Sequence, residues 1–435
     1  MKTSLSIFSA LFVATGTLAA QETVFPGRIN LYGEVRTFAS FDTRESKEGN
    51  EPLAYCAPYD QTLNLQGKDI YSNPSFKLQA LSTIVGIDLD AFKVGTLDLT
   101  GKIEGDFVLR SGNSSQFRLR QAYVDLVRED RFAEINRATL RVGQAWHPMS
   151  VDHPYCAMEE TGVPFNPYSR SPQVMLDLHF YEGFDVSVGA LYPVDCSPVG
   201  PKGESEDYVG YSLVPELYGG IYFSKKGFTA KIGSDFLLMR PRWQTLSTDG
   251  VTYDAGTKVN DKFFTFSPFA YLEWKKGRFA VNAKSVFANG GEHLNLLSGY
   301  ALYDYSDIYN YKYTPLRSTV SYFSIRYGNK WRLSAMGGYM KALGAARDLT
   351  LLSTGFADPD DIFFSSNGSY NINQFVRAAP CVSFNKDNLS LAAEYSLNLV
   401  QYGDETFLNR RALPYAETLH WIMSHRVLAV LKYRF

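Results

Sequence analysis

One long alternating segment, residues 97–109, constrains the fold of this 435-residue chain more than any other feature. Its apolar or small residues alternate with a polar set, which is Asp98, Thr100, Lys102, Glu104 and Asp106. Successive side chains of a strand point to opposite faces of its sheet, so one face here is apolar and the other is charged. A helix would place the acidic residues on one stripe but would scatter the leucines. The pattern therefore predicts a β-strand.

The length of this segment limits the number of β-folds that the chain can adopt. Soluble strands average about 5–6 residues, whereas a tilted strand that crosses a bilayer needs about 9–11. Two architectures remain, a large β-sandwich with one wet face and a membrane β-barrel with lipid outside and water inside. Aromatic residues make up 15% of the chain, which favours the girdles of a barrel. The formal net charge of −2 provides no broad basic surface, so no nucleic-acid partner is predicted.

The first residues have the pattern of a secretory signal. Lys2 provides the positive start, residues 5–13 a short apolar core, and residues 17–20 a small-residue cleavage region. We therefore predict a signal peptide at 1–20 and a single barrel domain at 21–435. After residue 20 no apolar run approaches the ~18–20 residues of a transmembrane helix, and only helices and closed barrels satisfy every backbone group in a bilayer.

Alternating segments recur along the whole chain. About sixteen strands are predicted, at residues 28–42, 76–90, 97–109, 117–127, 137–146, 172–181, 183–192, 212–223, 228–239, 261–274, 279–288, 316–327, 331–343, 373–384, 389–400 and 420–435. Long connections alternate with short ones, as in barrels that have short periplasmic turns and long extracellular loops. Sixteen strands also leave a water-filled channel, because barrel diameter grows with strand number. We predict an all-β, antiparallel transmembrane barrel of about sixteen strands.

Two parts of the sequence resemble outer-membrane porins. The closing strand ends in Phe435, which is similar to the terminal signal that the barrel-assembly machinery recognises. The block 97–146 ends in Val142-Gly143-Gln144-Ala145-Trp146, just before the long loop 147–171. It most resembles the DcaP-like porins of Gram-negative bacteria. This resemblance implies a sixteen-stranded homotrimer in the cell outer membrane, in contact with lipid and lipopolysaccharide, whose third loop, here 147–171, folds into the lumen.

The polar faces of the predicted strands supply the candidate lumen residues. Basic side chains exceed acidic ones there, and arginines in a narrow channel favour anions, because guanidinium stays charged and pairs with carboxylate or phosphate. Acidic groups of loop 147–171 would face this basic wall. The predicted pore lining and constriction comprise Arg36, Lys102, Arg110, Arg118, Arg120, Arg141, Asp152, Glu159, Glu160, Arg170, Arg326 and Arg377. Of these, Arg118 and Arg120 face the lumen only if Leu119 and Tyr123 face outward, which the pattern leaves open.

These features predict an outer-membrane porin through which small hydrophilic solutes diffuse, with a leaning toward anions. One alternative is that the arginines pair with Asp and Glu across the wall and leave little selectivity. Another is a surface-adhesion or structural barrel without an open pore, since long loops suit partner binding. No Ser-His-Asp arrangement, His-Glu-x-x-His, Gly-x-Ser-x-Gly or phosphate-binding motif stands out, so neither an enzymatic activity nor a cofactor is predicted.

The cysteines suggest one covalent restraint. Cys56, Cys156 and Cys196 fall in predicted outer loops of an exported chain, where one pair among them could form a disulfide. Cys381 falls in a predicted strand and is expected to act as a small buried hydrophobe.

One stretch with metal-ligating residue types needs a separate interpretation. His147, Asp152, His153 and Cys156 lie close together in the sequence. Prolines interrupt the stretch and no paired metal-binding motif is present. Ordinary polar loop residues are therefore favoured, and no metal is predicted.

Overall fold

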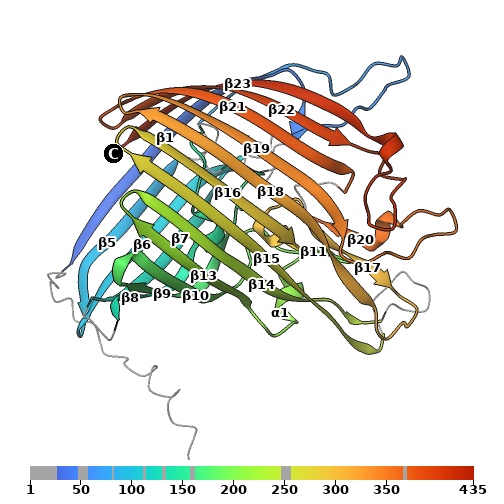
Figure 1. Ribbon diagram of the computed structural model, residues 1–435, viewed down its shortest axis with the longest axis horizontal. Helices are drawn as coiled ribbons and strands as arrows, with labels where there is room; N and C mark the ends of the chain where they lie inside the picture. Colours follow the sequence, from blue (N-terminus) through green and yellow to red (C-terminus); the bar gives the residue numbers. More distant parts are fainter. Residues whose placement is uncertain are drawn as a thin grey trace, which may run out of the picture.

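The computed structural model describes residues 27–47, 57–80, 83–110, 114–129, 134–156, 162–245, 256–365 and 370–435. Figure 1 shows these residues as a closed barrel of tilted strands. The predicted signal peptide, residues 1–20, lies outside the described residues. Three residues discussed above do so as well, namely Cys56, Glu159 and Glu160.

Sixteen long antiparallel strands form the barrel wall in the described part of the chain. They are β1 (Arg28–Asp42), β5 (Ile84–Val94), β6 (Leu97–Arg110), β7 (Ser114–Arg128), β8 (Ile135–Trp146), β9 (Arg170–Phe180), β10 (Phe184–Leu191), β13 (Glu216–Lys225), β14 (Phe228–Gln244), β15 (Lys258–Lys276), β16 (Phe279–Asn289), β18 (Lys312–Gly328), β19 (Trp331–Ala345), β21 (Ile372–Lys386), β22 (Leu389–Tyr402) and β23 (His420–Arg434). Each pairs with the next, and β23 returns to pair with β1 (Figure 1). The predicted fold class is confirmed.

The second strand of the wall is built from two pieces. β4 (Ser75–Gln79) pairs with one half of β1, and β5 pairs with the other half. The sequence pattern predicted one strand over 76–90, so the structure differs there. At the interruption the Thr83 hydroxyl lies 3.5 Å from the backbone N–H of Arg36, which donates a long hydrogen bond to it. A side chain thus replaces a ladder partner at this position.

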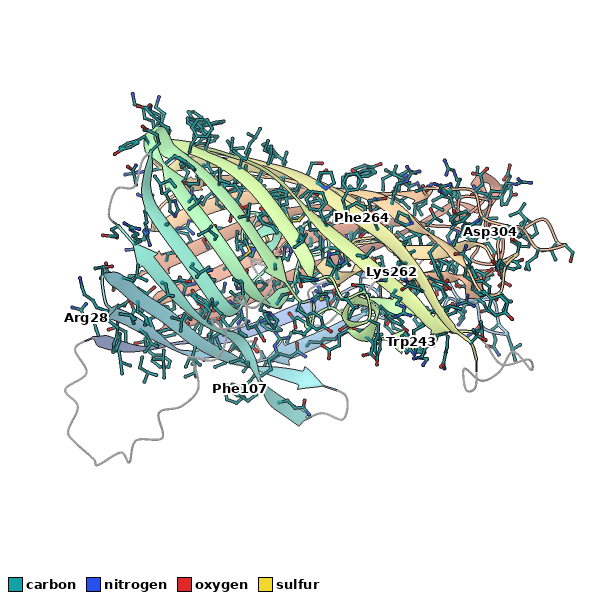
Figure 2. All side chains as sticks on the ribbon, turned by 90° about the horizontal axis from the view of Figure 1, so that it is seen from below. Arg28, Phe107, Trp243, Lys262, Phe264 and Asp304 are labelled. Atoms are coloured by element: carbon teal, nitrogen blue, oxygen red, sulfur yellow. The ribbon has the colours of Figure 1, made fainter. Side chains whose placement is uncertain are left out.

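Side chains alternate between the two faces of the wall, as the period-2 pattern requires. In β15, Phe264, Phe266 and Leu272 are exposed on the outside, whereas Thr265 and Ser267 are buried on the inside. Figure 2 shows Phe264 among the side chains of this wall. An apolar exterior and a polar interior are the reverse of a soluble protein and suit a lipid environment.

Exposed aromatic side chains gather at both ends of the outer surface. Near the short turns they are Phe184, Phe228, Trp274, Tyr327, Trp331 and Tyr433. Toward the other end they are Phe117 and Phe236, and also Phe107 and Phe264, which Figure 2 labels. Positions 264 and 274 of β15 are about 34 Å apart along the strand, or about 24 Å along the barrel axis at a tilt of about 45°. That height matches the ~25 Å apolar band between the aromatic girdles of outer-membrane barrels.

The connections sort by length as predicted. At one end, two-residue turns join neighbouring strands, and Lys226 and Gly227 have the positive φ angles, 52° and 82°, of a tight hairpin turn. The 3-10 helix η2 (Tyr181–Gly183) lies at this end too. The remaining short elements belong to the long connections and are β2 (Ser46–Lys47), β3 (Ala57–Pro58), η1 (Pro148–Ser150), β11 (Val199–Gly200), β12 (Gly203–Glu204), α1 (Asp207–Gly210), η3 (Glu292–Leu294), β17 (Gly299–Asp304), η4 (Pro359–Asp361), β20 (Ile362–Phe364) and η5 (Ala416–Thr418). None of the helices described is long and apolar enough to cross a membrane.

The barrel closes at a seam where the last residue meets the first strand. Gly33 and Phe435 exchange two backbone hydrogen bonds, of 2.9 and 3.0 Å. A Cβ atom on Gly33 would lie 2.5 Å from the Phe435 ring. A side chain at position 33 would therefore displace the terminal aromatic ring that covers this residue.

We expect Gly33→Val to weaken closure, because the added side chain must displace the Phe435 ring. Overpacking of this kind costs about 1–3 kcal/mol. The temperature at which the folded barrel loses its compact mobility in heat-modifiability gels should fall. The matched control is Gly337→Val on the outer face of β19, where an added Cβ meets nothing within 4 Å. Equal effects of the two substitutions would contradict this account of the seam.

Candidate functional site

Loop L3 is the connection 147–169 between β8 and β9, and its described residues, 147–156 and 162–169, turn inward and lie against the inner wall. Asp152 Oδ1 accepts a 2.7 Å hydrogen bond from Lys231 Nζ of β14. The hydroxyl of Tyr155 donates a 2.6 Å hydrogen bond to Glu273 Oε1 of β15. Burial and this hydrogen bond raise the pKa of Tyr155, so its proton stays available for donation. The described residues of L3 are thus held inside the barrel, as the resemblance to porins implied.

Two cationic side chains of the wall bind backbone carbonyls of L3. Arg377 of β21 donates from NH1 to Val163 O at 2.7 Å and from Nε to Asn398 Oδ1 at 2.7 Å. Lys284 of β16 donates to Met149 O. Both cations are nearly fully buried, so they hold the loop in place instead of contacting bulk solvent.

Apolar packing adds to these polar contacts. Met149, Phe165 and Tyr168 of L3 are at most 3% exposed, and the Phe165 ring packs edge-on against Phe375 at 5.0 Å. Gly338 of β19 leaves room for this ring, since a Cβ there would lie 2.4 Å from it. Burying one large apolar side chain contributes about 1.5–3 kcal/mol. The apolar core of this protein therefore lies inside the barrel, between L3 and the wall.

A second loop segment also folds inward, which the sequence analysis did not predict. Residues 290–298, which we call the L6 hook, precede β17. Leu294, Leu296 and Leu297 of this hook are at most 1% exposed. The backbone N–H of Tyr168 in L3 donates to Leu294 O at 2.9 Å. The apolar run at 294–297 is the sequence signal for this burial, because an exposed loop would not need it.

The opposite part of the inner wall, on β1 and β5–β8, pairs its charges within the wall. Arg118 binds Asp106 through two nitrogens at 2.8 and 3.1 Å, and Arg141 binds Asp125 at 2.8 and 2.9 Å. Three further pairs are Arg36 with Glu34, Lys102 with Asp88, and Arg120 with Glu104. These predicted lumen cations each have a carboxylate partner, which favours the charge-balanced alternative for this part of the wall.

A β-bulge in β7 settles which way its arginines point. Glu104 pairs with Gln121, but the next residue of β6 pairs with Leu119, so Arg120 is an extra residue in the ladder. Arg120 and Gln121 both donate to Glu104 Oε1, at 2.9 and 3.1 Å. Leu119 is 48% exposed on the outside, whereas Tyr123 stacks with an inner-wall arginine. A bulge reverses the alternation of the residues beyond it. A strict period of two therefore could not place both Leu119 and Tyr123 on the faces where the structure has them.

Trp146, the last residue of β8, lies between two arginines. The guanidinium carbon of Arg170 is 4.8 Å from the Trp146 ring and that of Arg120 is 5.7 Å away. Arg170 Nε also donates to Asp195 Oδ2 at 3.0 Å, and the Arg170 side chain is almost fully buried. Arg170 therefore joins the base of L3 to the following long connection.

The remaining predicted site residues have different environments. The Arg326 guanidinium, on β18, lies 4.4 Å from the Tyr155 ring. Asp152 was expected to face the basic inner wall, and its carboxylate pairs with Lys231 of that wall, on the side where L3 packs. Three positions lie outside the described side chains, namely Arg110, Glu159 and Glu160.

No disulfide is present among the cysteines that the structure describes. Cys56 lies outside these residues, so the disulfide stays a prediction. Cys196 donates from Sγ to Tyr168 O at 3.5 Å. Cys381 is 7% exposed in β21, in agreement with its expected role as a small buried hydrophobe.

Sequence reasoning missed one buried polar group on the inner wall. Glu216 of β13, Asp235 of β14 and His293 of η3 lie together, and His147 Nε2 is 2.7 Å from Glu216 Oε1. These residues are far apart in the chain and form no local motif, so only strand pairing and the inward turn of two loops bring them together.

The outer membrane channel DcaP of Acinetobacter baumannii superposes with a TM-score of 0.63 at 15% identity, covering 96% of this chain and 100% of that chain. The chain has the fold of the outer-membrane porins. This fold is shared with an anion-selective porin from Comamonas acidovorans (TM-score 0.51, 10% identity, 94% of this chain, 100% of that chain). It is also shared with the trimer form of OmpT of Vibrio cholerae (TM-score 0.50, 13% identity, 94% of this chain, 99% of that chain). No family model and no curated protein matches the sequence.

We expect Phe165→Ala to loosen L3 within the porin fold. Removing a buried aromatic ring costs about 3–5 kcal/mol, so the loop should become accessible to proteases in the folded barrel. Phe264→Ala, at a 54% exposed position of the outer face, is the matched control. Mapping the cleavage sites by mass spectrometry tests this expectation, and resistance of L3 equal to that of the unmodified chain would refute it.

Proposed function

We propose that this protein is an outer-membrane porin through which small hydrophilic solutes diffuse. The observation that carries the proposal is the division of the inner wall. L3 and the L6 hook pack on one side, and the facing strands β1 and β5–β8 present charged side chains. A charged, incompletely buried inner surface stays hydrated, as a water-filled channel requires. The porin fold and the outer girdles support the same conclusion.

The preference for anions is proposed to arise at a basic cavity near the short-turn end. This cavity of about 380 Å³ lies between the tip of L3 and β18–β23. Arg326, Arg332, Lys432 and Arg434 line it, together with the acidic Asp387. Guanidinium groups bind carboxylate and phosphate through paired hydrogen bonds. Small carboxylates and phosphate-like anions are therefore the solutes that this cavity suits.

Among the predicted site residues two roles are proposed. Lining residues, which contact the aqueous path, are Arg36, Lys102, Arg118, Arg120, Arg141 and Arg326. Residues that position L3 are Asp152, Arg170 and Arg377, because their contacts are with the loop and its base. Roles for Arg110, Glu159 and Glu160 remain expectations of the sequence.

A homotrimer is proposed as the working assembly. Ala39, Ala429 and Ala393 lie side by side on the outer face of β1, β23 and β22. They belong to a shallow apolar depression that also includes Leu391 and Leu431. Small residues allow a second barrel to approach closely. Light scattering or native mass spectrometry in detergent tests this assembly, and a monomer under mild conditions would contradict it.

Conductance in a planar bilayer tests the channel, and the reversal potential across a KCl gradient tests its charge preference. We expect discrete conductance steps with chloride preferred. Arg326→Gln should lower the chloride-to-potassium permeability ratio by roughly twofold, as expected for the loss of one unit charge about 8 Å from the ion path in water that contains about 0.1 M salt. Arg128→Gln, at the exposed end of β7, is the control and should leave the ratio unchanged.

The outcomes separate the two parts of this proposal. Steps with potassium preferred would retain the porin and refute the role of the basic cavity. A folded, heat-modifiable barrel without any steps would refute the porin and favour the adhesion or structural alternative.

A further inference from the structure

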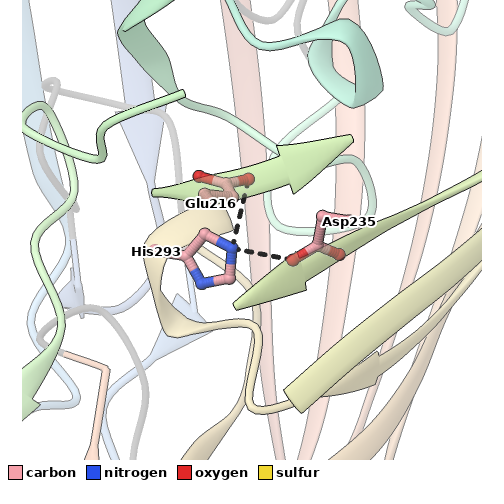
Figure 3. Close-up of side chains that lie close together, drawn as sticks. All are labelled: Glu216, Asp235 and His293. Carbon is pink, nitrogen blue, oxygen red and sulfur yellow. Dashed lines mark hydrogen bonds and ion pairs between the residues drawn. The ribbon is translucent and has the colours of Figure 1, made fainter. Parts of the chain in front are cut away.

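A buried group of metal-ligating side chains lies on the inner wall, away from the charged strands β5–β8. Glu216 and Asp235 occupy inward positions of the neighbouring strands β13 and β14, and His293 reaches them from the L6 hook (Figure 3). Glu216 and Asp235 have no exposed surface, and neither does His293. Three elements thus bring one imidazole and two carboxylates to a site without solvent contact.

The spacing of the ligand atoms suits one cation. His293 Nε2 lies 2.9 Å from Asp235 Oδ2 and 3.5 Å from Glu216 Oε1. The three residues can each offer one atom, and these atoms all lie within 4.8 Å of one another. A tetrahedral zinc ion with bonds of about 2.0–2.2 Å separates its ligand atoms by about 3.3–3.6 Å. Small adjustments would therefore bring all three atoms onto one ion.

Unsatisfied atoms point independently to a missing ligand. Among the described residues, Glu216 Oε2, Asp235 Oδ1 and His293 Nδ1 are buried without a hydrogen-bond partner. Both carboxylate oxygens of the adjacent Glu292, which is 3% exposed, are also buried without one. Burying carboxylate oxygens without hydrogen-bond partners or a counter-charge is costly. A divalent cation would supply the missing positive charge.

A second histidine orients this group from the base of L3. His147 Nδ1 accepts from the Met149 backbone N–H at 3.1 Å, which assigns the ring proton to Nε2. His147 Nε2 then donates to Glu216 Oε1 at 2.7 Å. Ligating carboxylates are usually held by such a neighbouring hydrogen bond. His147 is therefore a positioning residue that connects the site to L3.

We propose that Glu216, Asp235 and His293 bind a divalent first-row transition-metal ion, of which zinc is the best fit to the mixed nitrogen and oxygen ligands. The ion would join β13, β14 and the L6 hook, and through His147 the base of L3. Its role is structural, since it fixes the two inward loops to the wall. The proposal does not depend on conduction through the barrel.

The test uses the full-length folded barrel in detergent, stripped with a chelator and then titrated with Zn²⁺ alone. Calorimetry and elemental analysis after desalting should give one ion per protomer. Cobalt substitution in the unmodified chain should add visible d–d absorption of nitrogen and oxygen coordination, which Zn²⁺ then abolishes. This second measurement needs no variant, so it holds even where a substitution impairs folding.

Variants assign the ligands. His293→Gln should weaken Zn²⁺ binding by about 100-fold or more, whereas His147→Gln should weaken it by about 10–100-fold, as for loss of a group that holds a ligand. His179→Gln removes a partly exposed histidine of β9 that pairs with Asp185 and should leave binding unchanged. Zn²⁺ should also protect L3 of the stripped barrel from protease. Failure of the stripped, folded chain to take up Zn²⁺ or Co²⁺ would overturn the proposal, and so would unchanged binding in His293→Gln.

Discussion

The lack of hydrogen-bond partners in lipid is the constraint on which this structure depends. Every backbone group in the bilayer must find a partner within the protein, so the ladder has to close between β23 and β1. The apolar face of each strand then contacts lipid, and no second sheet is available to pack against it and form a core. The core forms inside the barrel instead, where L3 and the L6 hook cover one side of the polar inner wall. Closure and the inward loops are therefore consequences of the same constraint.

This division gives the two sides of the interior different properties. On the loop side, buried cations such as Arg377 bind backbone carbonyls, so their charge is used for anchoring. On the facing side, bidentate pairs such as Arg118 with Asp106 hold charged side chains in fixed positions and cancel their net charge. A passing solute therefore meets positive and negative groups in alternation, and not an electrostatic potential of one sign. The cavity that we propose as the origin of an anion preference is lined by three arginines, one lysine and one aspartate.

Local pattern predicted the strands because lipid enforces a strict period of two along each of them. The same regularity explains the failures. The bulge at Arg120 adds one residue and changes the faces within β7, which alternation alone cannot show. The partners of Asp152 and the meeting of Glu216 with His293 depend on contacts between distant parts of the chain. The sequence therefore predicted which residues line the walls better than it predicted which of them touch. The leucines of residues 290–298 indicate from the sequence that this segment is buried, but they do not indicate which part of the wall it packs against.

The seam between Gly33 and Phe435 also bears on the order of folding. These residues lie near the two ends of the described barrel, so their contact closes a loop of about 400 residues, and contacts between distant residues form slowly. Until the last residue arrives, β1 and β23 both present unpaired edges, which are templates for aggregation. The unfinished barrel therefore needs protection during its assembly. A chain shortened by its last residue would lose the ring that covers Gly33 and would meet this hazard for longer.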